Sequence, residues 1–172
     1  MWYTNTNKIN SGDIMTQKRT IVILTALVIL CTALIFSFSL RSMEESEKDS
    51  DFVADFVKPV IEKIFGYVPE NLGFIIRKLA HMTEFCILSV LTALLSVKIY
   101  KYKNEALFGY ALFYVLAVAV TDEFIQYFSG RGSSVVDVVI DFSGAAVGFA
   151  VIFLIYYLIP KLNAKHFSKA DE

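Results

Sequence analysis

The sequence predicts an all-α integral membrane protein: a four-helix bundle with an extra extracytoplasmic amphipathic helix between the first and second spans. Three observations predict this fold class. The 172-residue chain is 56% hydrophobic, above the roughly 45–50% of a soluble domain, and its mean hydropathy is +0.56. Its apolar residues gather into four long runs, each longer than an ordinary strand. A shorter segment between the first two runs carries one apolar stripe.

The first apolar run extends from Ile21 to Leu40 and contains no charged residue. About 20 such residues are enough to cross a hydrocarbon core of roughly 30 Å. A signal peptide has an apolar region of only about 7–15 residues, so we expect this helix to be retained. We therefore assign residues 1–19 to a flexible N-terminal tail and residues 20–41 to the first transmembrane helix. Met15 is a second candidate for the translation start.

Residues 42–72 are expected to form an extracytoplasmic connector. It opens with an acidic, solvated stretch, Ser42 to Asp51. In residues 52–65 the apolar residues recur in adjacent pairs every four residues, which predicts a helix with one apolar face. This helix is too short and too charged to span, so we expect it to lie in the membrane interface or to cap the bundle. Gly66 and Pro69 are expected to end it.

Three further spans are predicted at about Phe74–Val97, Ala106–Phe128 and Val135–Ile159, which place a three-helix core at residues 73–160 and a cytoplasmic tail at 161–172. Basic residues cluster at three of the predicted span ends: Lys18, Arg19, Lys98, Lys101, Lys103, Lys161, Lys165 and Lys169. An even number of spans puts all three clusters on one side, which the positive-inside rule identifies as the cytoplasm. The expected location is the bacterial plasma membrane, multi-pass, with both termini cytoplasmic.

The charged residues of the second, third and fourth predicted spans lie at a similar depth, and within each span polar residues share one helix face. At about 1.5 Å per residue, Glu84 lies ~21 Å from Lys98 and Asp141 ~30 Å from Lys161, which places both in the outer leaflet. Spacings of three and four residues put three groups on shared helix faces: Arg77, His81 and Glu84; Asp122 and Gln126, with Glu123 beside them; and Ser134, Asp137, Asp141, Gly144 and Gly148. Charges facing lipid at mid-membrane cost roughly 2.5–3.5 kcal/mol each. The pattern therefore predicts an inward-facing polar pocket that opens to the outside.

The blocks "RKLAHMTEF" (77–85) and "DEFIQYFSGRGSSVVDVVID" (122–141), with Gly144 after them, resemble the VanZ-like family of small bacterial membrane proteins. The resemblance covers about residues 72–149. It implies a membrane location and a link to glycopeptide (teicoplanin) resistance, and it supplies no reaction. Asp141 departs from the pattern, because family members often carry an Asn-like residue there.

These residues support more than one function. As an enzyme on a lipid-linked or cell-envelope substrate, the protein would use as acid–base candidates His81, Glu84, Asp122, Glu123 and Asp137. The candidates for substrate binding are Arg77, Lys78, Gln126, Arg131, Ser134 and Asp141, of which the arginines suit phosphate or carboxylate. The alternative is a non-enzymatic protein that binds or shields a cell-wall precursor headgroup or a drug. A third interpretation is a purely structural polar network.

Composition limits the partners. The net charge of −1 gives no basic field for nucleic acid, so the expected partners are the lipid bilayer and an envelope headgroup. The two cysteines lie inside apolar runs without metal-ligand spacing. No cofactor is indicated by a diagnostic spacing. A divalent cation is a candidate occupant of the pocket, because its acids outnumber its cations. Oligomeric state is not predicted.

Overall fold

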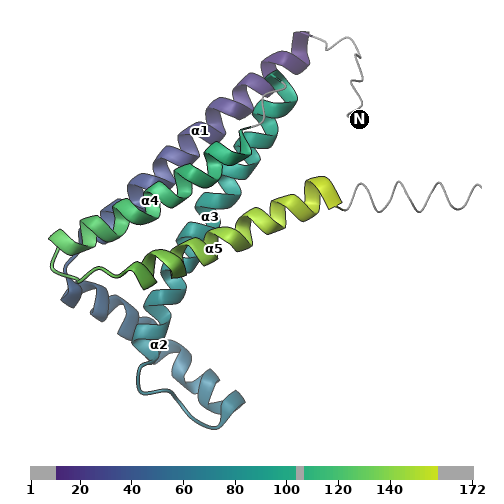
Figure 1. Cartoon of the computed structure of the whole chain (residues 1–172). Coiled ribbons are helices and arrows are strands. Elements are labelled where there is room, and N and C mark those ends of the chain that lie inside the picture. Colours follow the sequence, from purple (N-terminus) through teal and green to yellow (C-terminus); the bar gives the residue numbers. More distant parts are fainter. Residues whose placement is uncertain (1–10, 104–106, 159–172) are drawn as a thin grey trace, which may run out of the picture.

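A computed structural model describes residues 11–103 and 107–158, and this part of the chain consists of helices joined by short turns (Figure 1). The helices are α1 (Ser11–Ser39), α2 (Met43–Phe65), α3 (Leu72–Lys103), α4 (Phe108–Phe128) and α5 (Val135–Phe153), which continues as a π-helical turn, Leu154–Leu158. Four segments are long and apolar enough to cross a membrane: Ile14–Ser39, Leu72–Tyr100, Phe108–Phe128 and Val135–Tyr156. The prediction of an all-α protein with four candidate spans is confirmed.

The helix ends differ from the predicted boundaries. α1 begins at Ser11, inside the segment predicted as a flexible tail. α3 continues to Lys103, so most of the predicted linker after the second span is helical. Residues 98–103 contain no glycine or proline to end the helix, which explains this continuation. The predicted third-span start at Ala106, the end of the fourth span at Ile159 and the tail 161–172 lie outside the described residues.

α2 begins at Met43, which corrects the prediction that Ser42 to Asp51 is an open connector. Ser42 is the N-cap of this helix. Its hydroxyl accepts a hydrogen bond from the Glu45 amide, and its own amide donates to the Glu45 carboxylate. This reciprocal capping box satisfies two backbone donors that a helix start otherwise leaves free. At the other end Gly66 has a φ of 75°, a left-handed conformation that glycine adopts without strain.

The bundle is built around α3. α1 and α4 lie along one another, and α5 crosses α3 (Figure 1). Two glycines bring the α3 and α5 backbones together, because a Cβ at Gly144 would overlap the carbonyl group of Met82, and one at Gly148 would crowd the carbonyl oxygen of Cys86. The small-residue stripe predicted on the fourth span therefore forms a close helix contact.

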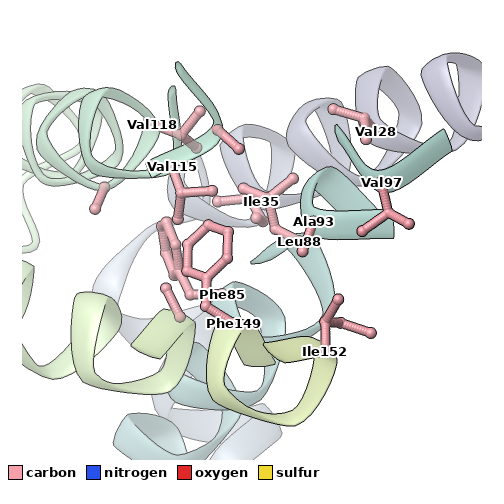
Figure 2. Packing of buried hydrophobic residues seen from close by; sticks show 13 residues of the cluster. Val28, Ile35, Phe85, Leu88, Ala93, Val97, Val115, Val118, Phe149 and Ile152 are labelled. Carbon is pink, nitrogen blue, oxygen red and sulfur yellow. The ribbon is translucent and has the colours of Figure 1, made fainter. Parts of the chain in front are cut away.

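The apolar core fills the space between α1, α3, α4 and α5. Figure 2 shows its residues, including Ile35 of α1, Phe85 and Leu88 of α3, Val115 of α4 and Phe149 of α5. The C-terminal ends of α1 and α4 and the N-terminal ends of α3 and α5 lie at one end of the bundle, where α2 also packs against α3 (Figure 1). We call this the α2 end. Nearly all of the predicted site residues lie on the helix segments and turn that form it.

Candidate functional site

Three spans each contribute one titratable side chain to a compact group, His81 of α3, Asp122 of α4 and Asp141 of α5, which we call the histidine–aspartate cluster. Nδ1 of His81 lies 3.8 Å from Oδ2 of Asp122 and 3.8 Å from Oδ1 of Asp141. Asp122 is 0% exposed and Asp141 2% exposed. A separation of 3.8 Å exceeds the roughly 2.7–3.2 Å of a hydrogen bond. The three groups therefore face one another without direct bonding.

Asp122 is held in place by neighbours on two helices. The Ser39 hydroxyl at the end of α1 donates to Oδ1 of Asp122. Nε2 of Gln126 donates to Oδ2 of Asp122 at 2.7 Å and to Oε1 of Glu123 at 3.1 Å. The other oxygen of Glu123 accepts from the Ser134 amide at 3.1 Å. Asp122 is thus positioned by α1 and α4 together, while Glu123 turns toward the start of α5.

Polar atoms without a hydrogen-bond partner concentrate at this end. Among the described residues, four buried side-chain atoms lack a partner, and three belong to the predicted site: His81 Nδ1, Asp141 Oδ2 and Arg131 Nε. The fourth, Gln17 Oε1, lies near the start of α1. Buried polar groups are normally hydrogen-bonded, so these three atoms at one site are free to bind a water molecule or a ligand.

The three cations of the site are paired to very different degrees. Lys78 forms a close ion pair with Asp137, at 2.7 Å. Arg77 lies 3.9 Å from the nearest carboxylate oxygen, on Glu47. Arg131 forms no ion pair with any described residue, because its guanidinium donates to the neutral Phe38 carbonyl and Ser46 hydroxyl, each at 3.1 Å. Two arginines therefore carry positive charge that neighbouring acids do not closely neutralise.

Arg131 lies in the turn between α4 and α5, outside the spans. Burial, and next the positive charge of Arg77, lower the pKa of Arg131 from its ordinary value. Arginine titrates so far above neutral pH that the side chain stays charged. The smaller of these two causes is repulsion between the guanidinium groups of Arg77 and Arg131, which a bound anion would relieve.

Two adjacent cavities open beside the cluster. The first, which we call the arginine pocket, has a volume of about 240 Å³. Its polar lining includes Arg77, His81, Glu84 and Arg131, and its apolar lining includes Phe38, Val53, Ile76 and Ala80. The second, of about 110 Å³, is lined by residues that include Lys78, Gln126 and Asp137. Arg77, His81 and Arg131 border both cavities, so His81 links the buried cluster to each of them.

Most of the residues predicted for the site belong to the cluster or line one of the two cavities. Among them, Glu84 lines the arginine pocket and has no hydrogen bond or ion pair with any residue in the described ranges.

Ser134 and Glu123 are partial exceptions. Ser134 is the N-cap of α5, and its hydroxyl accepts a hydrogen bond from the Val136 amide at 3.1 Å. Ser134 and Glu123 border a separate depression at the α4–α5 turn. Their side chains are thus engaged away from the arginine pocket.

Sequence reasoning missed the contributions of the first helix and of α2. Ser39 binds Asp122, Ser46 accepts from Arg131, and Glu47 is the nearest acid to Arg77. Ser39 stands at the C-terminal end of the apolar run Ile21–Leu40. This position is a weak signal that Ser39 lies at the same depth as the predicted pocket. No comparable signal marks Ser46 or Glu47, because their positions depend on how α2 packs on α3.

Fold and site together define a multi-pass membrane-type protein with a polar cluster at one end of its bundle. Residues 23–157 match the family model described as VanZ/LLP1, so the chain belongs to the VanZ/LLP1 family. This match extends beyond the resemblance at residues 72–149 to include α2 and most of α1. No curated protein and no solved structure matches the chain.

Proposed function

We propose that the protein binds a phosphate- or carboxylate-bearing, lipid-linked or cell-envelope substrate in the arginine pocket, from the outer face of the bacterial plasma membrane, and acts on it. The observation that carries the proposal is that Arg77 and Arg131 line one pocket without a close carboxylate partner. Guanidinium groups bind phosphate and carboxylate through paired, charge-assisted hydrogen bonds. Such an anion would neutralise both side chains.

An amphiphilic substrate fits this pocket better than a free ion does. Part of its lining is apolar, with Phe38, Val53 and Ile76, and part is charged. Its residues lie toward the ends of candidate spans, and in the proposed membrane position this is the level where lipid headgroups meet acyl chains. A headgroup would face the arginines while its tail follows the apolar wall into the outer leaflet.

The residues next to the arginines suit proton transfer. His81 and Glu84 both line the arginine pocket, and histidine and carboxylate are the usual general acids and bases of enzymes. An enzyme would hold the anionic group on Arg77 and Arg131 while one of these side chains takes a proton from the attacking group. Glu84 is available for this role because no described residue pairs with it.

One observation favours the second candidate, a protein that binds and shields the headgroup without chemistry. α2 contributes Ser46, Asp49, Ser50 and Val53 to the wall of the arginine pocket. A helix in this position would cover a bound headgroup and exclude other molecules from it. Under this alternative the link to teicoplanin resistance, which the family name suggests, follows from steric protection of a precursor or from capture of the drug.

α2 also supports the proposed position in the membrane. Phe52 and Phe56 are 78% and 81% exposed, and Val60 and Ile64 continue the same row of apolar side chains. Asp55 and Lys58 form an exposed ion pair elsewhere on the helix, at 2.6 Å. We propose that α2 is the extracytoplasmic amphipathic helix and that its exposed apolar row lies in the outer interface. The termini would then be cytoplasmic, beside Lys18, Arg19 and Lys98.

The test measures what the purified protein retains and what expressing cells change. The full chain is purified gently, and bound lipids are identified by native mass spectrometry for wild type, Arg77→Ala, Arg131→Ala and the matched control Arg19→Ala. Loss of charge-assisted hydrogen bonds worth about 1.5–3 kcal/mol weakens binding roughly tenfold to 150-fold. We expect the first two variants to lose a phosphate- or carboxylate-bearing lipid that wild type and Arg19→Ala retain. Equal retention in all four proteins would contradict the proposal.

The same cells separate the two candidate functions. Lipids and wall precursors are extracted and their masses compared between cells that express wild type and cells that express Glu84→Gln. A mass change that depends on Glu84 supports an enzyme. Retained ligand with no mass change in any extract supports shielding.

A further inference from the structure

We propose that His81, Asp122 and Asp141 form a binding site for a divalent transition-metal cation of the zinc or manganese type. The inference deepens the proposed function, because the role of the cation rests on the anionic substrate in the arginine pocket. The metal site itself rests on separate observations: the geometry of the three side chains, their unpaired atoms and the local charge.

The geometry suits one ion held by three helices. One nitrogen and two carboxylate oxygens, one from each residue, all lie within 4.8 Å of one another. Zinc bonds of about 2.1 Å in a tetrahedral arrangement separate neighbouring ligands by roughly 3.4 Å. The two histidine–carboxylate separations of 3.8 Å exceed this value only slightly. Small rotations of the side chains would therefore close the site around an ion.

The cluster also contains unpaired atoms that a cation could satisfy. Nδ1 of His81, which faces both carboxylates, and Oδ2 of Asp141, the oxygen other than the one 3.8 Å from His81, are buried and have no hydrogen-bond partner among the described residues. Asp141 is 2% exposed, and an unpaired buried carboxylate is costly. A metal ion bound to Nδ1 and to the Asp141 carboxylate would remove both deficits at once.

The charge of the site also calls for a cation. Its acids are Glu84, Asp122, Glu123, Asp137 and Asp141, and its cations are Arg77, Lys78 and Arg131. With His81 neutral and all acids ionised, the site carries a charge of −2. Lys78 is already engaged with Asp137, so four acids, two of them the buried Asp122 and Asp141, remain against two arginines. A divalent cation neutralises this excess.

The surroundings of Asp122 resemble the support that metal ligands receive from neighbouring residues. Ser39 and Gln126 each donate to one of its oxygens, which fixes the carboxylate and leaves lone pairs on both oxygens for a metal. Three protein ligands leave a coordination position for water or substrate. Because His81 borders the arginine pocket, that position can be reached by the substrate's anionic group. A histidine ligand favours zinc over calcium or magnesium, and the two carboxylates also suit manganese.

The experiment measures metal uptake by the full chain in detergent, without a polyhistidine tag. The protein is stripped with EDTA and dialysed, and free Mn²⁺ is followed by its electron paramagnetic resonance signal during titration. Zn²⁺ content after gel filtration is measured by mass spectrometry. The variants are Asp141→Asn and His81→Gln. The matched control, Asp55→Asn, removes an exposed carboxylate from α2. Circular dichroism and gel filtration establish that each variant is folded.

We expect about one ion per chain for wild type and Asp55→Asn, and at least tenfold weaker binding for Asp141→Asn and His81→Gln. No uptake by wild type overturns the inference, and this result does not depend on the folding of any variant. Equal uptake by Asp141→Asn and Asp55→Asn also overturns it, and means an adventitious ion only.

Lipid retention is measured on the same preparations, so the two proposals can fail separately. Arginine-dependent lipid retention without metal uptake overturns only the cation site. Metal uptake that requires Asp141, without any arginine-dependent lipid, supports the cation site and contradicts the proposed function.

Discussion

Buried polar side chains are hydrogen-bonded differently at the two ends of the bundle. Toward the end remote from α2, Ser89, Thr92 and Ser96 of α3 donate to carbonyls of their own helix, at 2.8–3.0 Å. At the α2 end, Asp122 accepts a hydrogen bond from Ser39 of another helix, and three buried atoms, including Nδ1 of His81, have no partner among the described residues. Both sets of residues are buried or nearly so, and only their bonding differs.

This difference distinguishes polar side chains that are hydrogen-bonded within their own helix from polar side chains that have no partner in the protein. A hydroxyl that bonds to the preceding turn of its own helix satisfies itself wherever the helix packs. A buried carboxylate or imidazole without a partner reduces stability and needs a ligand to offset the cost. Stability and function should therefore respond differently to mutation at the two ends.

The largest effect on stability is expected where the α3 and α5 backbones touch. In Gly144→Ala the new Cβ would overlap the Met82 carbonyl, and overpacking of this kind typically costs about 1–3 kcal/mol. Unfolding in detergent, followed by circular dichroism, measures the loss. Gly109→Ala is the control at the other end, since no atom lies within 4 Å of its Cβ position. Equal stability of the two variants would contradict the close contact.

The next effect has the opposite sign. Asp141→Asn is expected to raise the free energy of unfolding of the EDTA-treated protein by about 1–2 kcal/mol, because it replaces a buried carboxyl group, one oxygen of which has no hydrogen-bond partner among the described residues, with an amide that cannot ionise. The same substitution should lower stability relative to wild type when Mn²⁺ or Zn²⁺ is present. Thermal unfolding with and without metal measures both. A loss of stability in EDTA would show that the carboxylate is already satisfied within the protein.

Ser42→Ala should destabilise α2, which lines part of the arginine pocket, by about 1 kcal/mol, the usual value of an N-cap. The substitution removes the hydroxyl that accepts from the Glu45 amide. Hydrogen exchange should become faster in the first turns of α2 and stay unchanged in α4. Unchanged exchange in α2 would mean that packing on α3, and not the cap, holds this helix.

The smallest effect is expected at the remote end. Thr92→Val removes a buried hydroxyl that bonds only to the Leu88 and Ser89 carbonyls of its own helix, and the change in unfolding free energy should be about 0.5 kcal/mol, the low end of the net contribution of a hydrogen bond. Lipid retention should equal that of wild type. A loss above about 1 kcal/mol would remove the distinction between the two ends.

Helix periodicity in the sequence indicated which candidate side chains share a helix face. Arg77, His81 and Glu84 recur on one face of α3 and line the same pocket. Periodicity also explains the separation of Asp122 from Glu123. Neighbours in sequence point about 100° apart on a helix, so Glu123 reaches the Ser134 amide while Asp122 faces His81.

The parts that the sequence did not predict depend on packing between helices or on a capping signal that was overlooked. The pairing of Ser39 with Asp122 requires the register of α1 against α4, which no pattern within one helix contains. The start of α2 was available in principle, because Ser42 followed by Glu45 has the spacing of a capping box. The acidic composition of that stretch led instead to the prediction of a solvated connector.

The contact of Gly144 and Gly148 with the α3 backbone has a mechanical consequence. α3 and α5 are joined main chain to main chain, so they can hardly separate without losing their packing, and His81 and Asp141 travel together as parts of one rigid frame. If the proposed amphiphile binds at this end, it meets a fixed α3–α5 pair, and the contacts that can change are side-chain hydrogen bonds such as those of Ser39 with Asp122 and of Ser46 with Arg131.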